Sequence, residues 1–437
     1  MNAAEQMLAL IYLPLLNWRA GWGTGRRFHE LLRSERWPRE RLDDLQRAKL
    51  SDRLAAAVRE VPYYRNHGAY AAADRAGSAG EILRRLPILR RSDIQRAGRD
   101  MLGPGHVRAQ RSRTGGTTGA PLEVWRDAAT RTMAEAALWR GKSWAGIRPW
   151  DKAVSVRGMG KASVLGRLRM RLLRKWVVEA FQPAPDQRRR IRDLIGRIRP
   201  VSVEGYVTDL LDLARGQDIS AAGIRTVLTT GEMLYAHQKT ELEQAFGAPV
   251  HSYYGCNEIA ALAFECERGM RHVTDEHVVL EAVNADGEPV WDEPGRLLVT
   301  DLDNRAMPLI RYELGDIGVL SREPCACGRA HRVLKELVGR QQESIRNETG
   351  ERLSATFFAG RFRNLRHVGR LQLVQEDVRS VEILYDGDEA DAALELRDIV
   401  HEIRSRLGEE MKIRATRVDA IPLTARGKRP LIRGMKD

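Results

Sequence analysis

A run of glycine and hydroxyl residues at positions 112–121 is the first stretch whose residue types could do chemistry. It reads Ser-Arg-Thr-Gly-Gly-Thr-Thr-Gly-Ala-Pro and leads into the strand-like segment 122–125. Glycines allow tight turns, so backbone N–H groups and threonine hydroxyls can converge on phosphate oxygens. No Lys-Ser or Lys-Thr pair follows, so this is not a Walker A loop. The run favours phosphate binding, with an ordinary surface loop as the alternative.

Cysteine and histidine residues form a second pattern, one that could bind a metal ion. Cys266 and His272 are separated by five residues, and Cys325 and Cys327 flank a single residue. Four soft ligands of this kind suit tetrahedral Zn²⁺, and a site with four protein ligands has no open position for chemistry. The sequence therefore predicts structural zinc, with buried thiols beside a surface histidine as the alternative.

The elements that must position these residues begin with a predicted parallel sheet. Strand-like segments at 201–206, 226–232 and 250–258 each carry a glycine near an acidic residue at their ends, and helical patterns separate them. In such α/β sheets, ligands bind beyond the carboxyl ends of the strands. We therefore expect these glycine and acidic residues to converge on one crevice.

The remaining pattern divides the 437 residues into more than one unit, since a chain of this length exceeds one ordinary core. Helices are predicted over 29–60, with Pro62 ending the pattern and Ser92 capping a later helix. The segment 301–316 reads as a long polar loop between strands. After it, strands at 371–376, 380–385 and 412–418 and a helix with Leu396, Ile399, Ile403 and Leu407 on one face predict a small α+β unit.

The composition limits the partners. Apolar residues make up 43% of the chain and charged residues 30%, which is typical of a globular protein, and the formal net charge is +13. Arginine runs at 167–175 and 188–199 indicate solvated helix faces or an anionic partner, such as a nucleotide, coenzyme A or an acidic membrane surface. Nucleic acid is disfavoured because no recognition motif is found. The oligomeric state stays open.

One apolar run, from Met7 to Leu16, could bury against the large domain, or could contact a membrane surface or a partner. We favour burial. The run is too short to span a bilayer, and Pro14 interrupts any helix there. It does not read as a signal peptide. Four cysteines without a secretory disulfide pattern favour a reducing compartment, so a cytoplasmic location is expected.

Taken together, the motifs resemble those of adenylate-forming enzymes. The phosphate loop, the Tyr254–Glu258 corner, the Arg311–Asp316 segment, Gly339-Arg340 and Gly427-Lys428 follow one another in the order and spacing of that superfamily. Segments 61–65, 86–94 and 304–316 are more closely similar to the phenylacetate–coenzyme A ligase and CapK-like branch. The resemblance implies an α/β fold with a large domain at 1–339, containing an N-terminal helical segment at 1–70, parallel sheets and a small β-barrel-like part. A smaller α+β lid domain at 340–437 follows.

The resemblance also implies roles for individual residues. Glu258 would help to place Mg²⁺, and Lys428 would bridge the substrate carboxylate and the α-phosphate of ATP. Asp316 would accept hydrogen bonds from the ribose, supported by Arg340. The other implied nucleotide-binding residues are Thr114, Gly115, Gly116, Thr117, Thr118 and Gly119 at the triphosphate, and Gly231, Glu232, Tyr254, Gly255 and Asn257 around the adenine.

The chain departs from the family pattern at Gln341-Gln342, where an acidic pair usually forms the hinge.

Three functions follow as hypotheses. The first is ATP-dependent activation of an aryl or similar carboxylic acid, with transfer to coenzyme A. The second keeps adenylation but uses another acceptor in polysaccharide or secondary-metabolite biosynthesis, or transfers AMP as in coenzyme F390 synthetase-like relatives. The third is a non-catalytic nucleotide-binding scaffold, which retention of Glu258, Asp316 and Lys428 argues against.

Overall fold

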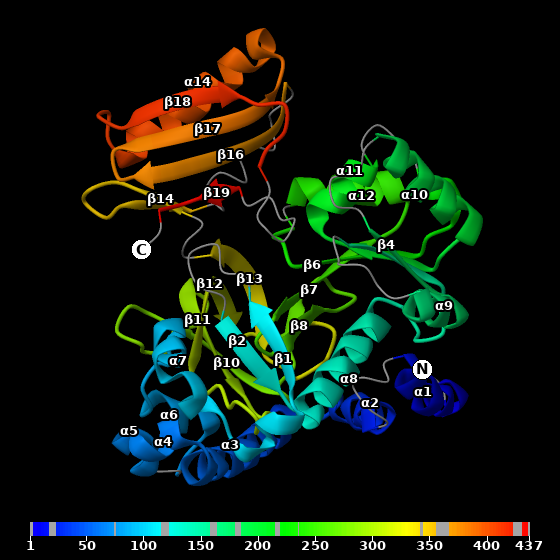
Figure 1. Cartoon of the computed structure of the whole chain (residues 1–437), viewed down its shortest axis with the longest axis vertical. Coiled ribbons are helices and arrows are strands. Elements are labelled where there is room, and N and C mark those ends of the chain that lie inside the picture. Colours follow the sequence, from blue (N-terminus) through cyan, green and yellow to red (C-terminus); the bar gives the residue numbers. More distant parts are fainter. Residues whose placement is uncertain are drawn as a thin grey trace.

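A computed structural model gives the arrangement of the chain (Figure 1). It describes residues 3–16, 23–73, 76–114, 122–157, 164–179, 185–214, 219–234, 236–340, 344–354, 367–422 and 431–435. Within these ranges, no helix combines the length and the apolar character that crossing a membrane requires.

One large sheet of eleven strands forms the centre of the molecule, in the order β10-β11-β12-β13-β9-β8-β7-β6-β5-β3-β4. Its parallel part confirms the predicted α/β pattern, because β4, β3, β5, β6 and β7 all pair in parallel. The bounds of these strands are β3 (Ala153–Arg157), β4 (Lys175–Glu179), β5 (Ser202–Gly205), β6 (Thr226–Thr230) and β7 (Val250–Cys256). The edge strand β4 was not predicted.

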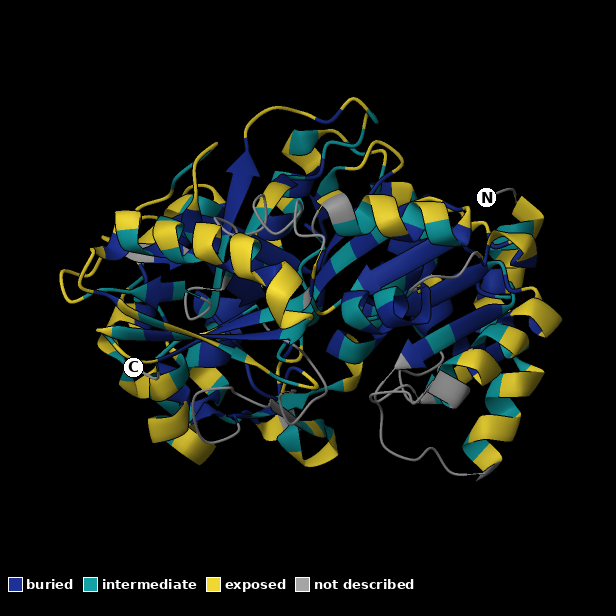
Figure 2. Ribbon diagram, turned by 90° about the horizontal axis from the view of Figure 1, so that it is seen from above, coloured by how far each residue is buried: buried dark blue, intermediate teal, exposed yellow. Residues whose placement is uncertain are grey.

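Helices cover both faces of this parallel part, because alternate strand residues point to opposite sides. Val227 packs with the helices of one face, and the neighbouring Leu228 packs with α8 on the other. The strands are mostly buried while the outer turns of the helices are exposed (Figure 2). The helices are α8 (Ala128–Trp144), α9 (Val164–Leu172), α10 (Pro185–Ile198), α11 (Val207–Ala214) and α12 (Ala236–Phe246).

The sheet continues beyond β7 with antiparallel strands. These are β8 (Ala260–Glu265), β9 (Arg271–Val273), β10 (Val278–Val283), β11 (Gly295–Asp301), β12 (Tyr312–Ser321) and β13 (Val333–Arg340). A connection between the strands is confirmed for residues 302–311, but the prediction of a polar loop that extends to Asp316 was wrong. β12 begins at Tyr312, and residues 306–312 are buried, because Ala306, Met307, Leu309 and Ile310 pack in the core.

The N-terminal part is helical: its helices from residue 39 onward pack against the antiparallel strands, whereas the earlier ones pack on each other and on α8. The N-terminal helices are α1 (Ala3–Leu16), α2 (Gly23–Ser34), α3 (Arg39–Glu60), α4 (Pro62–Asn66), α5 (Gly68–Ala71), α6 (Ala79–Arg84) and α7 (Arg91–Ala97). Pro62 separates α3 from α4, as predicted.

Two expectations about these helices were wrong. The carboxylate of Asp93, not Ser92, caps α7 by accepting from the Arg90 N–H at 2.8 Å, and Pro14 lies inside the last turns of α1.

The C-terminal part confirms the predicted α+β unit. β16 (Val368–Asp377), β17 (Ser380–Gly387), β18 (Lys412–Arg417) and the short β19 (Ile432–Arg433) form a four-stranded sheet, and α14 (Glu389–Leu407) packs on it. A hairpin of β14 (Ser344–Arg346) and β15 (Arg352–Ser354) precedes it. As predicted, Leu396, Ile399, Ile403 and Leu407 lie buried in its core. Figure 1 places this unit above the large sheet.

Candidate active site and metal centre

Two β-bulges shape the predicted nucleotide site. The pairing of β7 with β8 shifts register between Tyr254 and Gly255, and the pairing of β11 with β12 shifts between Glu313 and Ile317. Gly315, with φ +76°, lies in the second shift, and this left-handed backbone favours glycine. Bulges re-aim side chains beside active sites. The two bulges thus determine where Tyr254 and Asp316 point.

Tyr254 and Asp316 meet as a consequence. The Tyr254 hydroxyl donates a hydrogen bond of 2.6 Å to Oδ2 of Asp316, although 62 residues separate them in sequence. On the next strand, Arg340 is the register partner of Asp316. Two residues expected at the nucleoside, Asp316 and Arg340, are therefore neighbours on the adjoining strands β12 and β13, and Tyr254 reaches Asp316 from β7 of the same sheet.

Glu258 lies in the turn after β7, close to the first residue of β12. The Tyr312 hydroxyl donates to Glu258 Oε1 at 3.5 Å. Burial and the Glu258 carboxylate both raise the pKa of Tyr312, so this hydroxyl stays protonated and can donate. Arg126, at the end of β2, lies near Glu258 and Cys256; burial lowers the pKa of its guanidinium while these neighbours raise it. Sequence reasoning missed Arg126.

The glycine, acidic and amide residues predicted at the ends of β5, β6 and β7 differ in their contacts and burial. Glu232 accepts hydrogen bonds from the Thr208 N–H at 2.9 Å and from its hydroxyl at 3.1 Å, which joins the end of β6 to α11. Gly231 and Asn257 are exposed. Glu204 does not lie with them, because its carboxylate is buried within β5 and pairs with Lys142 of α8 at 2.7 Å. The expected convergence of acidic residues therefore does not extend to Glu204.

The phosphate loop connects two paired strands. β1 (Gln110–Thr114) and β2 (Leu122–Arg126) form an antiparallel hairpin in which Thr114 pairs with Leu122. Gly115, Gly116, Thr117, Thr118 and Gly119 lie outside the described residues, as do the side chain of Thr114, the side chain of Arg340, and Lys428.

The segment before β12 is fixed by buried polar contacts that no sequence pattern predicted. Arg311 has φ +54°, and its guanidinium donates to the Leu86 carbonyl at 2.8 Å and to the Gly287 carbonyl at 2.7 Å. Its Nε lies 3.3 Å from the carboxylate of the buried Glu281. These bonds hold the backbone that enters Tyr312, and so they help to position the site.

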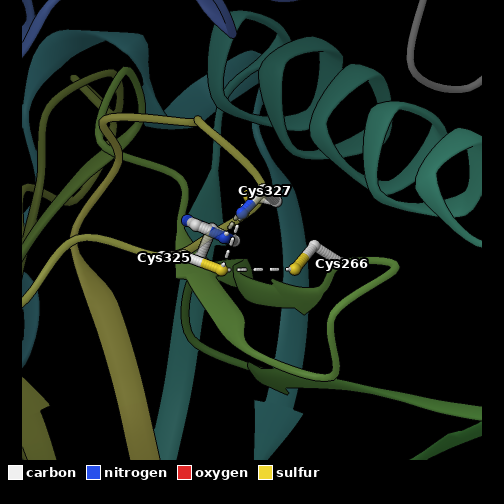
Figure 3. Close-up of side chains that lie close together, drawn as sticks. Cys266, Cys325 and Cys327 are labelled. Atoms are coloured by element: carbon white, nitrogen blue, oxygen red, sulfur yellow. Dashed lines mark hydrogen bonds between the residues drawn. The ribbon is translucent and has the colours of Figure 1, made fainter.

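The four predicted metal ligands come together at the opposite end of the β12–β13 hairpin (Figure 3). Their ligand atoms all lie within 4.8 Å of one another. The sulfurs of Cys266 and Cys325 are 3.8 Å apart, and Cys327 Sγ is 3.2 Å from His272 Nε2. Two sulfurs bound to one tetrahedral zinc are separated by about 3.8 Å. The donor set and its spacing therefore fit such an ion.

Hydrogen bonds and burial set the orientation and the protonation of the predicted metal ligands. His272 Nδ1 lies 3.3 Å from the His331 carbonyl, which leaves Nε2 facing the cysteines, and burial lowers the pKa of His272 to about 4, so its ring is neutral at pH 7. Burial raises the pKa of the Cys266 thiol to about 12, whereas for Cys327 hydrogen bonds from Arg329 outweigh burial and lower the pKa. Coordination to a cation deprotonates a thiol outright.

Known proteins are similar to this chain in sequence. Residues 345–434 match the CapK C-terminal domain family. Phenylacetate–coenzyme A ligase of Thermus thermophilus is 28% identical over 340 residues, which cover 71% of this chain and 73% of the relative. Protein CapK of Staphylococcus aureus is 21% identical over 360 residues, covering 79% of each chain.

The fold agrees as well. The crystal structure of 2-hydroxyisobutyryl-CoA ligase in the postadenylation state superposes with a TM-score of 0.73 at 18% identity, covering 92% of this chain and 91% of that one. The chain is thus similar to adenylate-forming enzymes, and within them to phenylacetate–CoA ligase and CapK. The match to the CapK C-terminal domain family spans β14 to β19, the unit that Figure 1 places above the large sheet.

Proposed function

We propose that this protein activates a carboxylic acid with ATP and transfers the acyl group to coenzyme A. The observation that carries the proposal is the hydrogen bond between Tyr254 and Asp316 at the two bulges, beside the register partner Arg340. A carboxylate fixed by a tyrosine hydroxyl can accept from both hydroxyls of a ribose. The acid that we propose is aryl or of similar shape, because the Thermus thermophilus relative is a phenylacetate–coenzyme A ligase.

The reaction needs no side-chain nucleophile. A carboxylate oxygen of the substrate attacks the α-phosphorus of ATP, and the bond to pyrophosphate breaks. The thiol of coenzyme A then attacks the acyl carbon, loses its proton and releases AMP. We assign the ribose to Asp316 and the bridging of the two anionic reactants to Lys428, whose charge offsets their repulsion.

Glu258 is the residue that we assign to Mg²⁺. The carboxylate is a hard oxygen ligand of the kind that Mg²⁺ prefers, and Tyr312 and Arg126 surround it with one donor and one positive charge. The ion, when it is bound with ATP, would neutralise charge on the phosphates. Tyr312 would keep the Glu258 carboxylate oriented toward it.

A pyrophosphate-release assay across carboxylic acids, with and without coenzyme A, tests the proposed function. We expect pyrophosphate release to require the acid, and AMP release to require coenzyme A. Acid-dependent pyrophosphate release without any effect of coenzyme A would favour another acceptor, such as an amine or a hydroxyl. Absence of acid-dependent release across a broad panel would leave only a nucleotide-binding scaffold.

Replacing Asp316 by asparagine should raise the dissociation constant of ATP by about 10- to 100-fold, the size expected from loss of charged hydrogen bonds. The sharper readout is discrimination, measured by calorimetric titration. The wild-type protein should prefer ATP to 2′,3′-dideoxy-ATP, and Asp316→Asn should lose that preference. Tyr254→Phe removes only the supporting hydroxyl and should weaken ATP binding by about fivefold. Unchanged discrimination in Asp316→Asn would remove the assignment.

We also propose that Cys266, His272, Cys325 and Cys327 bind one structural Zn²⁺. The ligands join the end of β8, β9 and the β12–β13 connection, so the ion would brace a hairpin that carries Asp316 at its far end. A site with four protein ligands leaves no position for substrate.

Metal analysis of the purified protein should find about one zinc per chain. Cys325→Ser should bring the zinc content close to zero and lower the melting temperature, because folding and metal binding are coupled. Cys256→Ser is the matched control, since Cys256 lies outside the cluster, and its zinc content should equal that of the wild type. Zinc that persists at the wild-type level in Cys325→Ser would contradict this ligand set.

A further inference from the structure

Large apolar side chains are exposed on two neighbouring helices, α1 and α9. On α1, Met7 is 69% exposed and Ile11 is 64% exposed. On α9, Leu165 is 76% exposed and Leu172 is 77% exposed. Single exposed apolar residues are ordinary, but contiguous ones mark an interaction surface.

The exposed residues of α1 belong to one helix face, and the opposite face is firmly packed. Met7, Ile11 and Leu15 recur every four residues and face outward, whereas Ala9 and Leu13 are fully buried. A Cβ atom added at Gly25 of α2 would lie 2.7 Å from the backbone of Leu10, so the two helices are in close contact. α1 is therefore a docked helix with an uncovered apolar face.

α9 lies beside α1 and continues this surface. The Tyr12 hydroxyl donates to the Leu173 carbonyl at 2.9 Å, and Arg169 donates to the carbonyl of Leu15. Both helices stand on the same side of the molecule in Figure 1. Leu165, Leu168 and Leu172 share one face of α9, because they are three and four residues apart.

The charge of this surface has one sign. From Val164 to Arg174 the sequence holds four arginines and no acidic residue. Arg167 and Arg171 are exposed and form no ion pair with the residues that the structure describes. On α1 the single charged side chain, Glu5, pairs with Arg148 at 3.0 Å. Exposed leucines beside arginines without an acidic partner complement a layer that has an apolar interior and negatively charged groups at its surface.

We propose that α1 and α9 together bind the surface of an anionic phospholipid bilayer. Helices with an apolar face and a basic flank lie in the plane of the interface, with the apolar side chains below the headgroups and the arginines at the phosphates. Neither helix is long and apolar enough to cross the bilayer, so the contact is peripheral. This surface is formed by helices other than the elements that carry Tyr254 and Asp316, and the proposal stands independently of the proposed catalytic function.

Flotation of the full-length protein with vesicles tests the proposal. The protein should float with vesicles of phosphatidylcholine mixed with phosphatidylglycerol, and much less with phosphatidylcholine alone. Arg167→Gln with Arg171→Gln should lower the partition coefficient about 30-fold, which corresponds to about fivefold for each arginine. Ile11→Glu with Leu168→Glu should abolish flotation, because both acids would enter the apolar layer.

Matched controls come from α14, which also exposes a leucine and an arginine. Leu394, 65% exposed, and Arg397 lie on that helix, and Leu394→Glu with Arg397→Gln should float like the wild type. Equal loss in this control, or equal flotation with both vesicle types, would overturn the proposal. Absence of flotation, together with a dimer by light scattering that Ile11→Glu with Leu168→Glu converts to a monomer, would assign the surface to a second copy of the chain instead.

Discussion

Replacement of Arg140 by methionine is expected to lower the free energy of unfolding by about 3–5 kcal/mol. The Arg140 side chain is fully buried, and its Nη1 lies 2.6 Å from Glu276 Oε1 and 3.3 Å from His331 Nε2. Ser34 of α2 donates to the same carboxylate. The cost is large because methionine would leave the Glu276 carboxylate buried without its main positive partner, and that partner joins α8 to the β9–β10 turn.

The pH dependence of this loss has a defined sign. Burial alone would raise the pKa of Glu276, but Arg140 and His331 lower it well below its ordinary value of 4.5. The wild-type pair therefore contributes stability above that value and loses it as the pH falls. In Arg140→Met the carboxyl can instead become neutral in acid, so the difference between the two proteins should shrink below about pH 4.5.

Urea unfolding at several pH values measures both effects. The matched control is Arg47→Met on α3, where Arg47 and Asp44 form an exposed ion pair at 3.2 Å. Exposed pairs contribute about 0–1 kcal/mol, so this variant should unfold close to the wild type. If the Arg140→Met protein were as stable as the Arg47→Met protein, the contacts of Arg140 with Glu276 and His331 would not stabilise the fold.

Replacement of Lys428 by alanine should lower the rate of adenylation by about 10²–10³-fold or more while leaving ATP affinity nearly unchanged. The reason follows from the proposed role. A cation that joins the carboxylate to the α-phosphate acts mainly when the two anions approach, and ATP alone has other contacts. Pyrophosphate release measures the rate, and calorimetric titration measures the affinity.

Lys412→Ala is the matched control for this experiment, because Lys412 is an exposed lysine on β18 of the same C-terminal part. It should adenylate at the wild-type rate. If Lys428→Ala kept strong adenylation, or if both variants lost it equally, the mechanism built on a bridging lysine would be wrong. A loss confined to ATP binding would instead make Lys428 a nucleotide-binding residue.

Much of the fold was predictable because local patterns and tertiary structure agree. Apolar runs ending at glycine gave β5, β6 and β7, and the spacing of Leu396, Ile399 and Ile403 gave α14. The cysteine and histidine residues were also correctly grouped, although 53 residues separate His272 from Cys325 in sequence, because soft ligands in buried positions have few other uses.

The errors have physical causes as well. Leu-Gly-Asp at 314–316 reads as a turn, whereas in the structure Gly315 uses its positive φ within a strand, and the bulge projects Asp316. Partners such as Glu281 for Arg311 and Lys142 for Glu204 depend on long-range packing, which periodicity does not encode. The roles of Gly115–Gly119 and Lys428 rest on resemblance, since both lie outside the described residues.

The antiparallel register of β12 and β13 bears on the order in which substrates enter. Asp316 lies opposite Arg340, and Gly339, with φ +133°, immediately precedes this last residue of β13. The chain leaves the large sheet here, so a ribose held by Asp316 would stiffen the point at which the chain passes into the C-terminal part. Because ATP would stiffen this point when it binds, we expect ordered kinetics, with ATP entering first and the thiol last.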